Sequence, residues 1–88
     1  MKNQKALYLE CLVKGVESIS SSRNTRRTVK YIRARGTFCS LIDQGEREEV
    51  ALSVALFDAV EWGWDEYIKV LKVVNKTLKA HKAETLKV

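Results

Sequence analysis

The sequence predicts one α+β domain over residues 1–88, in which an antiparallel β-hairpin or three-stranded meander is followed by two α-helices packed on the sheet. Three observations lead to this fold class. Apolar and polar residues alternate along residues 6–19 and again after residue 28, as is typical of half-buried strands. An acidic stretch rich in apolar residues then favours a helix, and lysines recur at helical spacing near the end of the chain. The length and the 45% hydrophobic content fit a single folded domain.

The first expected strand covers residues 6–19. Its odd positions form an apolar row that consists of Leu7, Leu9, Cys11 and Val13. The stretch SSSRNTRR at residues 20–27 follows, and its Ser, Asn and Thr side chains readily satisfy the backbone of turns. We therefore expect an exposed loop after the first strand.

The second expected strand begins near Thr28. Its inner face carries Ile32, Ala34 and Phe38. Gly36 marks either a bulge in one long strand or a tight turn into a third strand at residues 37–42. The meander is favoured, because an isolated hairpin is rarely stable by itself.

The first expected helix starts near Asp43, which stands three residues before Glu46 in a variant of the capping box. Gly63 is expected to end it, since glycine commonly follows the last turn of a helix. Apolar residues point nearly all round this helix, and they are Val50, Leu52, Val54, Leu56, Phe57, Val60 and Trp62. Such a helix lies either between two layers of its own chain or against a partner subunit.

Asp65 is expected to cap the second helix. One face of that helix is apolar and consists of Tyr67, Val70, Leu71, Val74 and Leu78. The opposite face carries Lys69, Lys72, Lys76 and Lys79. Their spacing of three, four and three residues aligns the lysines along one side.

Charge is strongly segregated along the chain, although the total is only +5. Residues 23–36 carry +6, residues 37–66 carry −7 and residues 67–88 carry +5. Basic blocks of this kind attract nucleic acid, whereas an acidic block on the same molecule can pair with them within a monomer or across a dimer.

The leading functional hypothesis is a small, non-enzymatic protein that binds DNA or RNA. In the expected sheet, arginines and tyrosines share one outward face, where they would contact phosphates and stack on bases. The expected binding residues are Tyr8, Arg23, Arg26, Arg27, Lys30, Tyr31, Arg33 and Arg35, extended by Lys69, Lys72, Lys76 and Lys79.

The alternative is a homodimeric protein-interaction or inhibitory module that does not bind nucleic acid. Trp62 and Trp64 are its expected interface residues, because exposed tryptophans are frequent hot spots of protein interfaces. Packing of a tryptophan back on the helix that it leaves also explains the pair, and from the sequence this structural explanation is the favoured one.

Enzyme chemistry, a metal site and a cofactor are not expected, because His81 is the only histidine and no cluster of ligands or glycine-rich phosphate loop is present. Cys11 and Cys39 lack the spacing of a metal site and fit free thiols in a reducing cytoplasm. No membrane association is expected, since no apolar run is long enough to span a bilayer.

Overall fold

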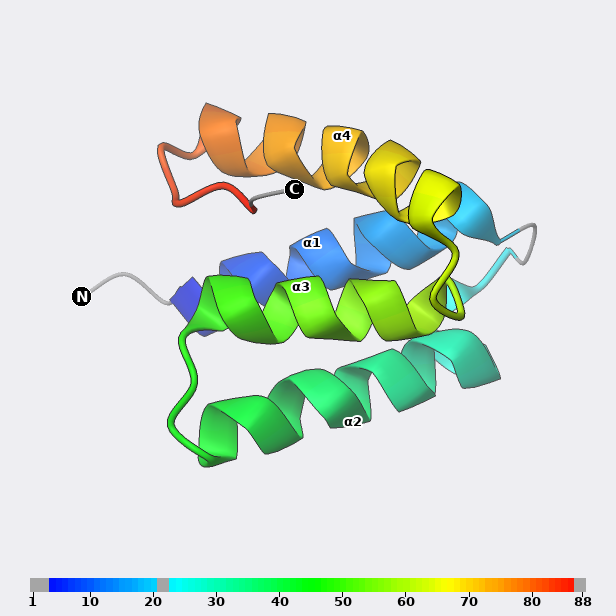
Figure 1. Cartoon of the computed structure of the whole chain (residues 1–88), viewed down its shortest axis with the longest axis horizontal. Coiled ribbons are helices and arrows are strands. Elements are labelled where there is room, and N and C mark those ends of the chain that lie inside the picture. The colour runs from blue at the N-terminus through cyan, green and yellow to red at the C-terminus, as the bar shows by residue number, and fades with distance from the viewer. Residues whose placement is uncertain (1–3, 21–22, 87–88) are drawn as a thin grey trace.

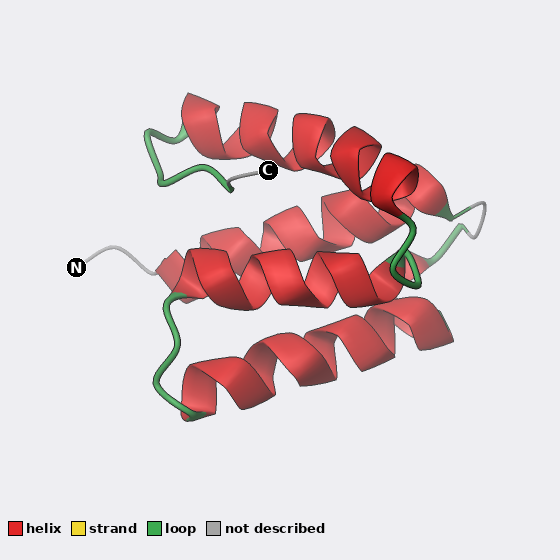
Figure 2. Cartoon of the chain, viewed as in Figure 1, coloured by secondary structure: helices red, strands yellow, loops and turns green. Residues whose placement is uncertain are grey.

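The chain is all-helical in the computed structural model, which describes residues 4–20 and 23–86. In these residues the elements are α1 (Gln4–Ile19), the short 3₁₀ helix η1 (Thr25–Arg27), α2 (Val29–Asp43), α3 (Glu48–Ala59) and α4 (Trp64–Ala80), and there is no strand. The predicted hairpin or meander, and with it the α+β fold class, is therefore wrong (Figure 2).

The helices α1 and α3 are both central to the molecule, because each of them contacts the other three α-helices. In Figure 1, α4 lies above α1, α2 lies below it, and α3 covers it from the front. The neighbours α2 and α3 form one tightly packed pair, and α1 and α4 form the other. The core fills the space between these two pairs.

The helix α1 replaces the first expected strand because its fully buried residues follow a helical period. Tyr8, Cys11, Leu12 and Val16 are spaced by three, one and four residues, which places them on one face of a helix. Leu7 and Leu9 are only half-buried, at the edges of that face. The apolar stripe of the helix is therefore wide, and its width produces the alternation that resembles a strand.

Gly15 allows α1 to lie close to two other helices. A Cβ atom at this position would be 2.6 Å from Leu56 Cδ2 and 3.1 Å from Val70 Cγ1. Both distances are shorter than ordinary van der Waals contact, so only glycine fits without movement of its neighbours. The glycine thus sets the approach of α3 and α4 to the central helix.

The helix α2 replaces the second and third expected strands. Thr28 caps it, because the Thr28 hydroxyl oxygen accepts a hydrogen bond from the Tyr31 backbone N–H at 3.1 Å. Ala34 and Phe38 are buried as predicted, but Ile32 is exposed. Gly36 is neither a bulge nor a turn and lies within the helix.

The exposed loop predicted over residues 20–27 contains a helical turn, since Thr25 to Arg27 form η1 and the Thr25 side chain is buried. Residues 21 and 22 of that loop lie outside the described residues.

The helix expected between Asp43 and Gly63 is present as α3, but its predicted bounds are wrong. Asp43 is the last residue of α2, and α3 begins only at Glu48. Gly63 does not end α3; instead it precedes α4 as the N-cap residue. One side of α3 packs against the chain itself, whereas Val50 and Val54 remain exposed on the other side.

The helix α4 confirms the predicted element. Its buried residues are Tyr67, Val70, Leu71, Val74 and Leu78, which are the members of the predicted apolar face. Asp65 lies in the first turn of α4 and not at the cap position. No helix within the described part of the chain combines the length and the apolar character that crossing a bilayer requires.

The residues after α4 fold back along the helix and are held by two side chains. The Asn75 side chain accepts from the Leu86 backbone N–H at 2.7 Å and donates to the Leu86 carbonyl oxygen at 2.9 Å. The Tyr8 hydroxyl donates to the Glu84 carbonyl oxygen at 2.9 Å. Leu86 is thereby buried in the core.

Candidate protein interface at the α3–α4 turn

The basic residues of α2 do not share one face, contrary to the sequence-based prediction. Arg33 and Arg35 are two positions apart on a helix, which separates them by about 200° around its axis. Arg33 lines a hollow together with Asp58 and Glu61, whereas Arg35 lines a different hollow that contains Glu10. The expected single cationic surface is therefore divided between two sides of α2.

The two tyrosines of the predicted nucleic-acid surface are buried. Tyr8 is 1% exposed and Tyr31 is 7% exposed, so neither ring presents a face on which a base could stack. Burial, together with the nearby Glu49 carboxylate, raises the pKa of Tyr8 to about 12. Both tyrosines act as core residues in this fold.

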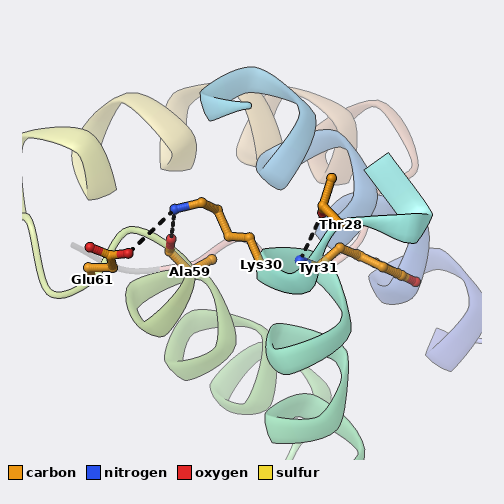
Figure 3. A network of polar contacts seen from close by, with 5 residues as sticks. All are labelled: Thr28, Lys30, Tyr31, Ala59 and Glu61. Carbon is orange, nitrogen blue, oxygen red and sulfur yellow. Dashed lines mark hydrogen bonds and ion pairs between the residues drawn. The ribbon is translucent and has the colours of Figure 1, made fainter. Parts of the chain in front are cut away.

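Two further members of the predicted basic surface contact carboxylates of the same chain. Arg26 forms an ion pair with Glu10. The Lys30 Nζ atom donates a hydrogen bond to the Ala59 carbonyl oxygen at 3.1 Å and lies 3.8 Å from Glu61 Oε2 (Figure 3). Lys30 is thereby directed towards the end of α3 and not towards open solvent.

The remaining predicted basic residues are exposed, and they are Arg23, Arg27, Lys69, Lys72, Lys76 and Lys79. The four lysines lie on the outer face of α4, as predicted. Three of them, Lys72, Lys76 and Lys79, line a hollow of about 410 Å³ beside the folded-back C-terminal segment. None of the ion pairs found among the described residues involves α4.

Four aromatic rings gather where α3 ends and α4 begins. Phe57 lies at the centre, with ring centroids 5.0 Å from Trp62, 6.3 Å from Trp64 and 5.0 Å from Tyr67. Trp62 is 72% exposed and Trp64 is 55% exposed, although both contact this cluster. Trp62 and Trp64 were the two predicted interface residues, and the fold brings them together at the surface.

These rings surround an open cavity of about 370 Å³, which we term the aromatic groove. Its principal lining residues are Val54, Phe57, Asp58, Trp62, Trp64 and Tyr67. Sequence reasoning missed Val54, Phe57 and Tyr67 as members of this site. For Val54 and Phe57 the sequence did contain a signal. Apolar residues lie nearly all round their helix, and one buried face does not explain such a distribution.

The turn that presents Trp62 has an unusual backbone. Glu61 and Trp62 both adopt the left-handed region, with φ angles of 54° and 64°. For a residue with a Cβ atom this conformation costs about 1 kcal/mol or more. Backbone hydrogen bonds hold it in place, from Glu61 N–H to Asp58 O at 3.0 Å and from Trp62 N–H to Phe57 O at 3.1 Å. The turn therefore fixes Trp62 against Phe57 instead of leaving its direction free.

One acid, Asp58, lines the groove, and three more, Glu61, Asp65 and Glu66, are next to lining residues in the sequence; we term these four acids the acidic rim. No lysine, arginine or histidine occurs between residues 58 and 66. The Asp58 side chain accepts a hydrogen bond from the Thr37 hydroxyl at 3.3 Å, and Glu61 is the carboxylate that Lys30 approaches. The groove thus has an apolar lining with one carboxylate, Asp58, and three further acids in the adjacent sequence.

Comparison of the chain with protein-family models, with curated proteins and with solved structures gave no match. The fold and the surface define it as a small all-helical domain, and its function has to be inferred from its own residues.

Proposed function

We propose that this protein is a small, non-enzymatic interaction module that binds another polypeptide through the aromatic groove. The observation that carries the proposal is that Trp62 and Trp64 are exposed and line one cavity. The left-handed turn fixes the backbone at Trp62. Tryptophan is the residue most enriched at the energetic centres of protein interfaces. Exposing two of them together is unfavourable in water unless a partner covers them.

The apolar surface continues from the groove along α3. Val50, Val54 and Phe57 follow one another at spacings of four and three residues, which aligns them on one side of the helix. Val50 and Val54 are both exposed. A stripe that leads into a groove matches the way in which an amphipathic helix of a partner docks onto another protein.

Selection from a display library of random 16-residue peptides tests this function. The chain and the double variant Trp62→Ala, Trp64→Ala serve as separate targets, and Ile32→Ala is the matched control because it removes an exposed apolar side chain from α2. We expect peptides that bind the chain and the control but not the double variant. A selection that yields no tryptophan-dependent peptide would overturn the proposal.

The homodimer predicted from the sequence stays a prediction. Two copies joined groove to groove would bring their acidic rims together, and like charges at short range oppose such a contact. We therefore propose that the partner meets this groove with a surface other than a second groove.

A second candidate function is binding of DNA or RNA through the lysine face of α4. It is favoured by the hollow that Lys72, Lys76 and Lys79 share without an ion pair among the described residues. The proposed contact surface is smaller than the one predicted from the sequence, because Tyr8 and Tyr31 are buried.

Fluorescence anisotropy with labelled DNA and RNA oligonucleotides tests the second candidate. Three phosphate contacts predict a fall in log K against log salt with a slope of about −2.7 for duplex DNA. Replacing the three lysines by glutamine should abolish binding, whereas Lys14→Gln, at an exposed position on α1, should not. Absence of binding at low salt would eliminate this candidate.

A reducing, cytoplasmic location is proposed for the protein as well. It is supported by the two free cysteines, Cys11 in the core and Cys39 at its edge, which do not form a disulfide.

A further inference from the structure

We infer that the partner of the aromatic groove is a second copy of this chain, which covers the groove with the outer side of its helix α2. This inference rests on the proposed function and names the partner of the same groove. The contact is reciprocal, so that each copy offers its own α2 to the groove of the other copy. The reasons are the distribution of the exposed apolar residues, the positions of the two surfaces and the charges that accompany them.

The exposed large apolar residues form two patches. The first patch is the groove with the stripe that leads into it, and its exposed members are Val50, Val54, Trp62 and Trp64. The second patch consists of Val29 and Ile32 on α2, which are 71% and 57% exposed, and we term it the α2 ridge. Within the described residues, Val73 is the only other large apolar residue that is exposed. A contact between ridge and groove would therefore cover nearly all of the apolar surface that the fold leaves in water.

The ridge is convex where the groove is hollow. Val29, Ile32 and Gly36 are spaced by three and four residues, which places them on one side of α2. The opposite side of this helix faces the core with Tyr31, Ala34 and Phe38. Nothing lies within 4 Å of a Cβ atom built on Gly36, so the surface beside Ile32 is low and open. The groove, with about 370 Å³, lies in the volume range of cavities that enclose small apolar groups.

The ridge and the groove lie side by side at one end of the α2–α3 pair, whose helices run next to each other in Figure 1. The hydrogen bond of 3.1 Å from Lys30 Nζ to the Ala59 carbonyl oxygen joins the start of α2 to the end of α3 (Figure 3). Val54 and Asp58 line the groove and also line a hollow that Gly36 borders. Ridge and groove are therefore neighbours on one continuous surface.

This placement permits a closed dimer. A two-fold axis that runs along the helices between α2 and α3 places the ridge of each copy on the groove of the other. Such a dimer has two identical contacts and leaves no surface for further growth. The two grooves do not meet in it, so the like charges that oppose a groove-to-groove contact stay apart.

Charges of opposite sign accompany the two surfaces. Residues 18–42, which include the ridge, contain no acid, and residues 48–68, which include most of the groove, contain no base. Two ridges or two grooves would bring like charges together, whereas a ridge on a groove brings opposite charges together. The charge pattern thus selects which surfaces meet.

Part of this charge is balanced within one chain, in a hollow that is lined by Lys30, Arg33, Asp58 and Glu61. Arg27, two residues before Val29, and Asp65, directly after Trp64, are exposed and take part in none of the ion pairs found among the described residues. These two charges remain for a contact between copies. Burial of apolar residues supplies the affinity of this contact, and charge supplies its selectivity.

Sedimentation velocity from about 1 μM to about 1 mM protein tests the inference. We expect a monomer at the lowest concentrations and a dimer at the highest, without larger species. Ile32→Glu in the ridge and the double variant Trp62→Ala, Trp64→Ala in the groove should each weaken the dimer by about a hundredfold, because each change occurs twice in a two-fold contact. Val73→Glu is the matched control and should retain the dimer, since Val73 is exposed on α4 outside both patches.

A mixture of the ridge variant and the groove variant tests the pairing itself. Neither variant has an intact contact with its own kind. A mixed dimer has one, between the groove of Ile32→Glu and the ridge of the tryptophan variant. We therefore expect the mixture to associate more tightly than either variant alone, and no gain on mixing would contradict the pairing of ridge with groove. Circular dichroism verifies the fold of each variant, and Ile32→Glu, which changes only an exposed side chain, tests the inference without the tryptophan variant.

The outcomes separate the inference from the proposed function. A chain that stays monomeric at every concentration but yields tryptophan-dependent peptides would overturn the inference and assign the groove to a different polypeptide. A monomer that yields no such peptide would overturn both. Association that survives Ile32→Glu, or growth beyond the dimer, would contradict the two-fold contact. In dilute solution the copies are apart and Ile32→Ala keeps an intact groove, so this variant binds selected peptides as the chain does.

Discussion

Trp62 lies on Phe57 with ring centroids 5.0 Å apart, yet its own backbone is in the left-handed region and most of its ring faces solvent. A residue chosen for the stability of the turn alone would be glycine, which adopts this conformation without a steric penalty. A large apolar side chain at such a position adds strain and exposure together. Contact with a partner gives a physical reason for both features.

Replacement of Glu61 by glycine tests the strain in this turn. Glu61→Gly should raise the free energy of unfolding by about 0.5–1 kcal/mol, because it relieves a left-handed φ and loses only a long, exposed ion pair with Lys30. Urea unfolding provides the measurement. Glu46→Gly is the control, since Glu46 does not have a positive φ, and it should not stabilise the protein. A decrease in stability for Glu61→Gly would contradict the strained turn.

Two glycines on different helices should respond to alanine in opposite directions. Gly15→Ala should lower the free energy of unfolding by about 1–3 kcal/mol, because the new Cβ atom would meet Leu56 and Val70. Gly36→Ala should raise it by about 0.5–1 kcal/mol, since nothing lies within 4 Å of that position on α2. Thermal or urea unfolding of the two variants measures the pair. Stabilisation by Gly15→Ala would show that α1 does not approach α3 and α4 as closely as described.

Stability should decrease in alkaline solution because of two core residues. Burial raises the pKa of Cys11 from 9.0 to about 11 and the pKa of Tyr8 from 10.0 to about 12. The folded protein therefore holds both protons more tightly than the unfolded chain does. Their contribution is fully present below about pH 9 and is lost as the pH rises towards 12.

Urea unfolding at a series of pH values between 9 and 12 measures this decrease. Tyr8→Phe should make the dependence on pH shallower, although it also removes the hydrogen bond to the Glu84 carbonyl oxygen. A dependence that remains as steep in this variant would show that Tyr8 titrates as it does in the unfolded chain.

The Asn75 side chain should control the segment after α4. Asn75→Ala removes both hydrogen bonds to Leu86 and should lower the free energy of unfolding by about 1–2 kcal/mol. Proteolysis after α4 should become faster in the same variant. Asn24→Ala is a suitable control because the Asn24 side chain makes no capping hydrogen bond. Equal proteolysis rates in the two variants would contradict the role of Asn75.

The sequence predicted α4 well and the first half of the chain poorly, and the reason is the width of the apolar faces. In α4, lysines and apolar residues occupy opposite sides, so a helical period is unambiguous. In α1, half-buried Leu7 and Leu9 extend the core face, and the wider face imitates the alternation of a strand. In α2, Thr28 is the N-cap residue of a helix, whereas the pattern of the sequence predicts a strand that begins there.

The candidate site was predicted only in part. Trp62 and Trp64 were recognised because two tryptophans around one glycine are conspicuous in any sequence. Their position beside Phe57 depends on the left-handed turn, which two residues other than glycine would not normally adopt. The predicted alignment of Arg33 and Arg35 on one face was wrong for a different reason, since a strand would have aligned these two residues whereas a helix separates them.

The emission spectrum of the tryptophans tests the aromatic groove most directly, because Trp62 and Trp64 are the only tryptophans of the chain and both line the groove. Titration with a tryptophan-dependent peptide from the display selection should shift the emission to shorter wavelength and saturate. Ile32→Ala should respond identically. An emission spectrum that does not change while the peptide binds would place the contact elsewhere on the molecule and contradict the role of the groove.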